Sequence, residues 1–197
     1  MNLKHNKEIV IRNGLKLFYN KGYQSLGVDE ICKVTGMTKG AFYNAFKSKE
    51  QFLIEAVFLY EENNIKRIKA ELEPTKKKTA FKRLHQFYIN MLEAQPKVCF
   101  TGCFINNIMA ELGIGNELVG KISHNAFTKF IEAIEPTIIE AQKNGEIMKS
   151  INSKQLTQLI HSTFYGALTI AKSSRDKKQS IQTINLLFNN LKSKTNE

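Results

Sequence analysis

Apolar residues recur at spacings of three and four along most of the chain, a period typical of helices with one buried face. The first such run, which includes Val10 and Phe18, predicts a helix at residues 4–20 that stops before Gly22. Gly14 lies inside this helix, where glycine costs about 1 kcal/mol relative to alanine unless another helix packs closely against it. We therefore interpret Gly14 as a helix contact point.

Two short helical patterns follow, with a tight turn between them at Gly36. The first has an apolar face made of Leu26, Val28, Ile31 and Val34. Gly36 can adopt the left-handed conformation that a tight helix exit needs, and Thr38 offers an N-cap hydroxyl to the second helix, residues 39–45. In that helix Phe42 and Phe46 are expected to face inward. This stretch predicts a helix-turn-helix, a motif that reads DNA.

Helical patterns also fill the rest of the chain. Ser48 with Gln51 forms a capping box that opens a helix ending before Pro74. Further helices are expected at residues 81–96, 102–112, 117–144, 153–173 and 177–194. Pro136 should bend or split the third of these.

Length and charge narrow the possibilities. A chain of 197 residues with three prolines suits an all-α protein, with a helix-turn-helix domain at residues 1–47 and a larger regulatory and dimerisation domain at residues 48–197. The formal net charge of +11 indicates an anionic partner, either nucleic acid or a membrane surface. No apolar run reaches the length of a membrane span and the start lacks the apolar core of a signal peptide, so we expect a cytoplasmic location.

The three cysteines are expected to be thiols, because an odd count in a chain of this size does not suit a disulfide scaffold. Cys103 precedes a predicted helix, whose dipole stabilises a thiolate, so it is a candidate sensor with Cys99 as a resolving partner. The alternative for Cys103 is a small buried apolar residue. Cys32 is expected to pack between the helices of the DNA-binding domain.

A ligand cavity is the other hypothesis for an effector site. Its candidate lining is aromatic and apolar with a few polar groups: Phe81, His85, Tyr88, Phe104, Met109, Phe127, Phe130, His161, Phe164 and Tyr165. Each of these residues has an equally good interpretation as core. His85 and His161 are expected to form hydrogen bonds, since no neighbouring histidine or carboxylate completes a metal-ligand set. We expect neither a metal nor a cofactor.

The last two helices carry more apolar surface than a terminal hairpin needs. Leu156, Ile160, Phe164, Leu168 and Ile170 belong to one helix, and Ile181, Ile184, Leu187, Phe188 and Leu191 to the other. Gly166 would allow a partner helix to approach closely. The pattern predicts an isologous homodimer built from these helices, with an ordinary intrachain core as the alternative.

Two other functional classes fit the sequence less well. An enzyme is disfavoured, because the chain has neither a phosphate-cradling glycine loop nor a recognisable nucleophile motif. A basic membrane-surface helix is disfavoured, because the early basic residues interleave with the helix-turn-helix pattern. Double-stranded DNA is the expected partner.

Residues 28–52 resemble the DNA-binding signature of the TetR family of transcriptional regulators. The resemblance rests on Val-x-Glu-Ile-Cys, Gly-Met-Thr-Lys-Gly-Ala-Phe-Tyr-Asn and Phe-Lys-Ser-Lys-Glu, and extends upstream through Phe18 and Gly22-Tyr23. It implies a three-helix DNA-binding domain and a helical ligand-binding domain that dimerises through its last two helices. The implied function is a dimeric repressor released from a palindromic operator by a small molecule or by thiol modification. The alternative is an activator or a ligand-independent DNA-binding protein of the same fold.

The resemblance also implies roles for individual residues. It assigns Thr38, Lys39 and Gly40 to the start of the recognition helix, and Tyr43, Asn44 and Lys49 to phosphate contacts. The sequence departs from the family at Ala45, where histidine or tyrosine is more frequent, and at Leu26-Gly27, where hydroxyl residues are usual.

A second group of residues resembles one branch of the family. The group comprises Leu26-Gly27, Gly40 to Tyr43, Gly102-Cys103-Phe104, Asn106 and Ala110-Glu111. Members of that branch often repress reductase or detoxification genes and respond to reactive electrophiles. The resemblance therefore implies an electrophile as effector, with Cys103 as its target.

Overall fold

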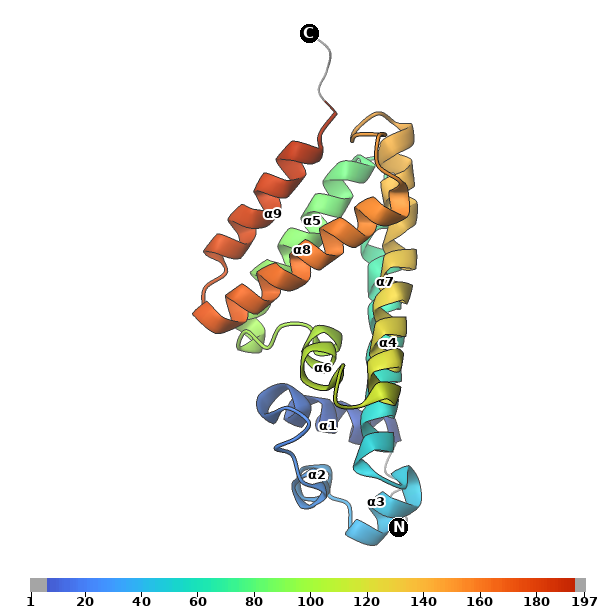
Figure 1. Cartoon of the computed structure of the whole chain (residues 1–197), viewed down its shortest axis with the longest axis vertical. Coiled ribbons are helices and arrows are strands. Elements are labelled where there is room, and N and C mark those ends of the chain that lie inside the picture. Colours follow the sequence, from blue (N-terminus) through green and yellow to red (C-terminus); the bar gives the residue numbers. More distant parts are fainter. Residues whose placement is uncertain (1–6, 194–197) are drawn as a thin grey trace. The chain divides into compact units, whose positions relative to one another are not determined.

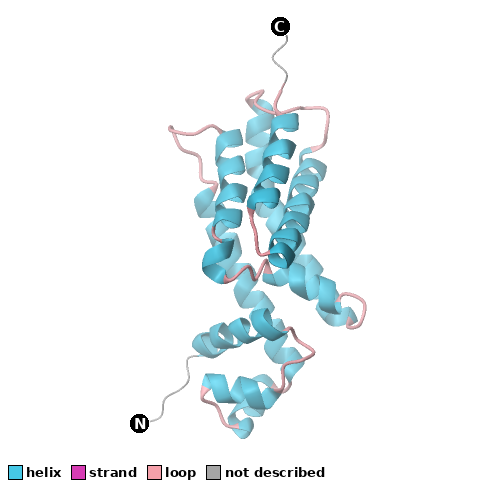
Figure 2. Ribbon diagram, turned by 90° about the vertical axis from the view of Figure 1, so that its left-hand side faces the viewer, coloured by secondary structure: helices cyan, strands magenta, loops and turns pink. Residues whose placement is uncertain are grey.

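The computed structural model describes residues 7–193, and within this range the chain is helical (Figures 1 and 2). The elements are α1 (Lys7–Lys21), α2 (Val28–Thr35), α3 (Lys39–Phe46), α4 (Lys49–Glu71), α5 (Ala80–Glu93), the 3₁₀ helix η1 (Gln95–Val98), α6 (Phe104–Leu112), α7 (Glu117–Lys143), α8 (Ser153–Ser174) and α9 (Lys178–Leu191). The all-α prediction is confirmed. The predicted helix ends at residues 4 and 194 lie outside the described residues. None of the helices in the described range is both long and apolar enough to cross a membrane.

Both internal prolines of the helical regions change the predicted pattern. Pro96 does not end α5 but opens η1, because proline lacks an N–H and fits the first turn of a new helix. Pro136 lies inside α7, which stays one continuous α-helix, so the predicted split is wrong. The fully buried Ile134 and Ile138 flank it, and burying each such side chain stabilises the helix position by about 1.5–3 kcal/mol, comparable to the cost of an internal proline.

The chain forms two compact units. The first comprises Met1–Asn63 and Phe104–Phe127, and the second comprises Asn64–Cys103 and Thr128–Glu197. The boundaries at residues 63 and 127 fall inside α4 and α7.

Aromatic rings form the core of the first unit. Phe42 and Phe46 of α3 contact Phe52 of α4, with ring centroids 5.4 and 4.7 Å from it, and all three side chains are buried. Phe18 of α1 lies against the same Phe52 ring. A Cβ atom on Gly14 would lie 2.2 Å from Phe52 Cζ, so only glycine lets α1 approach this ring. The prediction that Gly14 is a contact point is confirmed.

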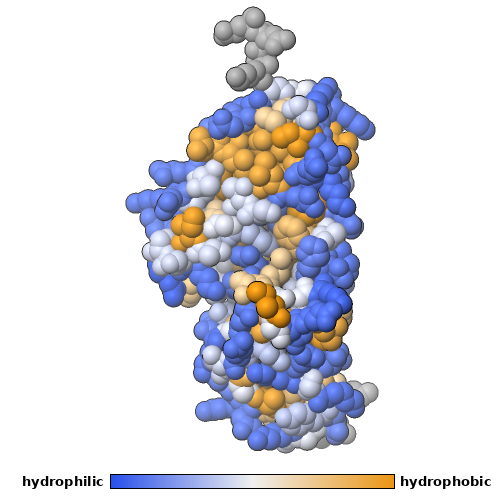
Figure 3. Space-filling model, viewed as in Figure 1, coloured by the Kyte–Doolittle hydropathy of each residue, from blue (hydrophilic) through white to orange (hydrophobic). Residues whose placement is uncertain are grey.

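In the second unit α5, α8 and α9 pack side by side, as Figure 1 shows. Tyr88 of α5, Phe164 of α8 and Phe188 of α9 bring their rings together at the centre of these helices. Apolar residues also gather on the outer face of this unit, toward the upper end of the view in Figure 3. The exposed apolar side chains of the second unit include Leu159, Ile170 and Leu186.

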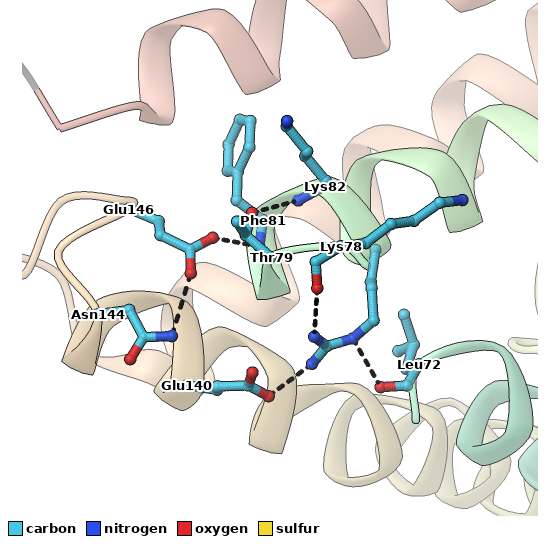
Figure 4. Close-up of polar contacts among 9 residues, drawn as sticks. Leu72, Lys78, Thr79, Phe81, Lys82, Glu140, Asn144 and Glu146 are labelled. Atoms are coloured by element: carbon cyan, nitrogen blue, oxygen red, sulfur yellow. Dashed lines mark hydrogen bonds and ion pairs between the residues drawn. The ribbon is translucent and has the colours of Figure 1, made fainter. Parts of the chain in front are cut away.

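A buried arginine fixes the segment that joins α4 to α5. The Arg83 side chain is only 4% exposed, and its guanidinium donates hydrogen bonds to the carbonyl oxygens of Leu72 and Lys78 and to the Glu140 carboxylate (Figure 4). A buried charge of this kind is tolerated only when it is fully paired, so the role of Arg83 is structural.

Glu146 lies near the start of α5. Burial raises its pKa, but hydrogen bonds from Thr79, the Phe81 N–H and Asn144 together hold the pKa of Glu146 below its usual value.

Candidate nucleic-acid interface

The turn between α2 and α3 has the conformation that its sequence predicts. Gly36 has φ +70° and its N–H donates to the Cys32 carbonyl, which closes the end of α2. The Thr38 hydroxyl accepts from the Ala41 N–H at 3.2 Å and caps α3. Cys32 is buried at this junction, so its predicted packing role is confirmed. We call residues 28–46, comprising α2, the turn and α3, the reader.

One face of α3 is exposed and the other is buried. Phe42 and Phe46 are at most 1% exposed, as predicted. The opposite face exposes Thr38, Lys39, Gly40, Tyr43 and Asn44. No atom lies within 4 Å of the Cβ position of Gly40, so no internal contact requires glycine there. The face offers a cation, a phenol and an amide around a small residue, which is the chemistry that phosphates and base edges bind.

The acidic start of α2 holds two of the basic side chains near the reader. Lys39 Nζ lies 2.6 Å from Asp29 Oδ1, and Lys21 Nζ lies 2.6 Å from Glu30 Oε1. The hydrogen bond to Asp29 raises the pKa of Lys39, so this side chain stays charged. Both ion pairs lie at the surface and contribute little to stability. A DNA phosphate can therefore replace either carboxylate as the partner of the lysine.

Lys49, at the start of α4, turns into the first unit. Its Nζ donates to the carbonyl oxygens of Tyr23 and Leu26, each at 2.9 Å, and lies 4.1 Å from the centre of the Tyr23 ring. The side chain thereby ties α4 to the loop between α1 and α2. The phosphate contact that the family resemblance implies for Lys49 stays a prediction.

Sequence reasoning missed the structural part that Glu111 of α6 plays. Its carboxylate accepts the N–H groups of Tyr23 and Gln24 at 2.9 Å, on the same loop that Lys49 holds. Two signals were available in the sequence. Glu111 belongs to the Ala110-Glu111 pair of the branch resemblance, and Gly22 can adopt a positive φ, here +73°, which exposes successive N–H groups that need an acceptor.

Four of the predicted effector residues meet in the second unit, and we call them the thiol cluster. Cys103 Sγ donates to the Tyr165 hydroxyl at 3.6 Å, and the Tyr165 ring lies 4.7 Å from the His161 ring. The Tyr88 hydroxyl and His161 Nδ1 are 3.2 Å apart. Burial lowers the pKa of His161 to about 3 and raises the pKa of Tyr88. Both side chains are therefore uncharged near neutral pH. The Cys103 thiol thus lies beside a row of uncharged polar groups.

Of the other predicted effector residues, Phe164 and Phe130 also lie beside His161, with ring centroids 5.8 and 6.4 Å from it. Four others make different contacts. His85 Nε2 and Asn185 Oδ1 are 2.7 Å apart, a contact that joins α5 to α9, and Cys99 is exposed. Phe104 and Phe127 belong to the first unit, where Phe104 packs against Phe18, Tyr19 and Tyr60.

A cleft of about 300 Å³ lies at the surface of the second unit. Its lining is Glu71, Thr75, Lys77, Lys78, Arg83, Gln86, Phe87 and Asn90, and the predicted effector residues are not part of it. Within residues 7–193, no group of three or more histidine, cysteine, aspartate or glutamate side chains is arranged to hold a metal ion.

Comparison with known proteins identifies the family. Residues 10–56 match "Bacterial regulatory proteins, tetR family", and residues 80–187 match "Tetracyclin repressor-like, C-terminal domain". The transcriptional regulator AcuR of Cereibacter sphaeroides is 34% identical over 169 residues, covering 83% of this chain and 74% of AcuR. The HTH-type transcriptional repressor DhaR of Mycobacterium sp. strain GP1 is 24% identical over 182 residues, covering 92% of this chain and 90% of DhaR.

The fold is also that of solved structures of the family. The reduced form of E. coli NemR superposes with a TM-score of 0.85 at 20% identity, covering 96% of this chain and 98% of NemR. The helix-turn-helix, the matched regions and the shared fold agree: the chain belongs to the TetR family and is a DNA-binding transcriptional regulator, not an enzyme.

Proposed function

We propose that the protein is a homodimeric repressor that binds a palindromic operator with one α3 helix per copy. The observation that carries this proposal is the exposed face of α3, which has a capped N-terminus and no internal partner for Gly40. Thr38, Lys39 and Gly40 read base edges in the major groove, while Tyr43 and Asn44 contact phosphates. The similarity to DhaR, a transcriptional repressor, supports repression over activation.

The outer faces of α8 and α9 support self-association. One side of α8 exposes residues without charge: Gln155, Gln158, Leu159, Ser162, Gly166, Thr169, Ile170 and Ser173. The α9 helix adds Gln182, Leu186, Asn189 and Asn190. In a chain with a net charge of +11, a long surface without charge is where two copies can meet with least repulsion. No atom lies within 4 Å of the Cβ position of Gly166, so a partner helix has room to approach.

The thiol cluster is the proposed point of release. Cys103 lies directly before α6 and is only partly buried, with its Sγ 3.6 Å from the Tyr165 hydroxyl. An electron-poor alkene would react with it by addition: a bond forms between Cys103 Sγ and one alkene carbon, and the thiol proton passes to the neighbouring carbon. Exposed Cys99 is the proposed resolving thiol under oxidising conditions. A small apolar ligand bound near Tyr88 and Tyr165 is the alternative effector.

The proposal is tested by fluorescence anisotropy on the DNA that flanks the gene, with an unrelated duplex as control. We expect binding to the flanking DNA to be about 10³-fold tighter than binding to the control at the same salt concentration. N-ethylmaleimide should release the wild-type protein from DNA and leave the Cys103→Ser variant bound. Equal binding to both duplexes would reject the repressor proposal, and release of the Cys103→Ser variant would reject Cys103 as the sensor. Transcription that rises on binding would identify an activator.

A further inference from the structure

The loop at residues 22–26 leads from α1 into the reader and is held from two sides by opposite charges. On one side the Glu111 carboxylate accepts from the Tyr23 and Gln24 N–H groups, with Oε1 at 2.9 Å from both nitrogens. On the other side Lys49 donates to the carbonyl oxygens of Tyr23 and Leu26. The peptide groups on both sides of Tyr23 are therefore each fixed by a charged partner.

The backbone of the loop fits this arrangement closely. Gly22 has φ +73°, and a Cβ atom there would lie 3.0 Å from both Glu111 carboxylate oxygens. The carboxylate thus lies against the loop backbone at the point where α1 ends. A second contact within the first unit joins the connection between α6 and α7 to α4, because the Asn116 side chain donates to the Glu50 carboxylate in the first turn of α4.

The start of α2 depends on this loop for its position. Gly27 is the N-cap of α2 and provides no side-chain hydrogen bond, whereas Thr38 does so for α3. A helix start without a side-chain cap leaves backbone N–H groups without an intrahelical acceptor, and it frays more easily. In this chain the Glu111 carboxylate instead holds the loop that connects α1 to α2, at Tyr23 and Gln24, a few residues before the N-cap.

We propose that Glu111 is a positioning residue for DNA binding, which holds the loop at residues 22–26 so that α2 and α3 meet DNA in one orientation. The inference rests on DNA binding through α3. It predicts that removal of the Glu111 carboxylate lowers operator affinity, whereas the change in net charge alone would raise that affinity. Removing a carboxylate makes the chain more basic, which by itself tightens binding to any DNA. Loss of positioning weakens binding to the operator.

The test compares Glu111→Ala with Glu117→Ala. Glu117 lies in the same unit, its side chain is 82% exposed, and its removal changes the net charge equally. We expect Glu117→Ala to bind operator as tightly as wild type or more tightly. Glu111→Ala should bind operator about tenfold more weakly but unrelated DNA as tightly as wild type or more tightly. Glu111→Gln keeps an oxygen at the Oε1 position and should restore most of the affinity.

Amide hydrogen exchange without DNA gives an independent reading. The amides of Tyr23 and Gln24 should exchange about tenfold faster in Glu111→Ala than in wild type, with Glu117→Ala unchanged. Equal exchange rates, or operator binding by Glu111→Ala that matches Glu117→Ala, would overturn the proposal. If the alanine variant does not fold, Glu111→Asp decides, because it keeps the charge and shortens the reach: weaker operator binding supports the proposal and wild-type binding overturns it. If the wild-type protein does not bind operator DNA, the repressor proposal is rejected instead. The amide exchange rates would still test the contact between Glu111 and the loop.

Discussion

The reader and the thiol cluster are built in different ways. The reader uses nineteen consecutive residues, 28–46, and its turn, cap and buried rings are all fixed by neighbours in the chain. The thiol cluster brings Tyr88 of α5 and Cys103 to one turn of α8, which carries His161 and Tyr165, and these three parts of the chain meet only through packing of the second unit. A local motif can therefore keep one function across a family, while a site assembled by packing is free to change its ligand.

The largest expected effect comes from separating two copies of the reader. Leu186→Glu together with Gly166→Arg places charges on the uncharged faces of α8 and α9, so we expect a monomer. Operator affinity should fall about 100-fold, since one reader per molecule loses the second half-site. Light scattering coupled to size-exclusion chromatography and anisotropy measure the two effects. Ile114→Glu, at a fully exposed position in the first unit, is the control, and a monomer that retains wild-type affinity would contradict the dimer proposal.

A change inside the first unit tests whether the reader depends on its aromatic core. Gly14→Ala puts a methyl group against the buried Phe52 ring, and overpacking of this kind destabilises by about 1–3 kcal/mol. Gly40→Ala, in α3, meets no atom within 4 Å and should instead stabilise by up to about 1 kcal/mol through helix propensity. Chemical denaturation measures both free energies of unfolding. Equal changes in the two variants would show that Phe52 moves aside without cost.

The buried His161 of the thiol cluster should make the free energy of unfolding depend on pH. The pKa of His161 is about 3 in the folded protein and 6.5 when exposed, so below pH 6.5 the unfolded chain binds a proton that the folded chain excludes. Stability therefore falls as pH decreases, by about 2 kcal/mol between about pH 7 and pH 5 from this residue. The His161→Phe variant should lack that component of the pH dependence in denaturation curves. A variant with the wild-type slope would contradict the assignment.

The smallest expected effect is that of Lys49→Ala on DNA affinity, which distinguishes two roles for Lys49. If the side chain contacts phosphate, Lys49→Ala weakens binding to operator and unrelated DNA alike, and reduces the salt dependence by about one counterion. If its bonds to Tyr23 and Leu26 matter more, the variant loses operator affinity about tenfold while the salt dependence stays unchanged. Anisotropy titrations at several salt concentrations measure both. Lys47→Ala, exposed at the end of α3, is the matched control.

Several features follow from short-range chemistry and were predictable. Gly36 needs a left-handed conformation that glycine adopts without strain, Thr38 supplies a cap, and the spacing of Phe42 and Phe46 places both on one helix face. Gly14 was predictable as a contact point because an internal helical glycine is costly without a close neighbour.

Other features depend on partners that sequence spacing does not specify. Lys49 is a basic residue in the first turn of α4, a position that by itself indicates a phosphate contact. In the structure its ammonium instead donates to two carbonyl groups some 25 residues away in the chain. The continuity of α7 through Pro136 was also unpredictable, because it depends on burial supplied by other helices.

The sequence by itself determined the all-α fold, the reader and the TetR-like signature, because periodicity, capping and turn chemistry act between residues within about four positions of each other. Only the tertiary structure decided that Glu111 holds the loop before α2, that Cys103 meets Tyr165, and that Phe104 and Phe127 belong to the first unit. These contacts join residues that are far apart in the chain, and they form where packing brings a donor to an acceptor, which no local pattern encodes.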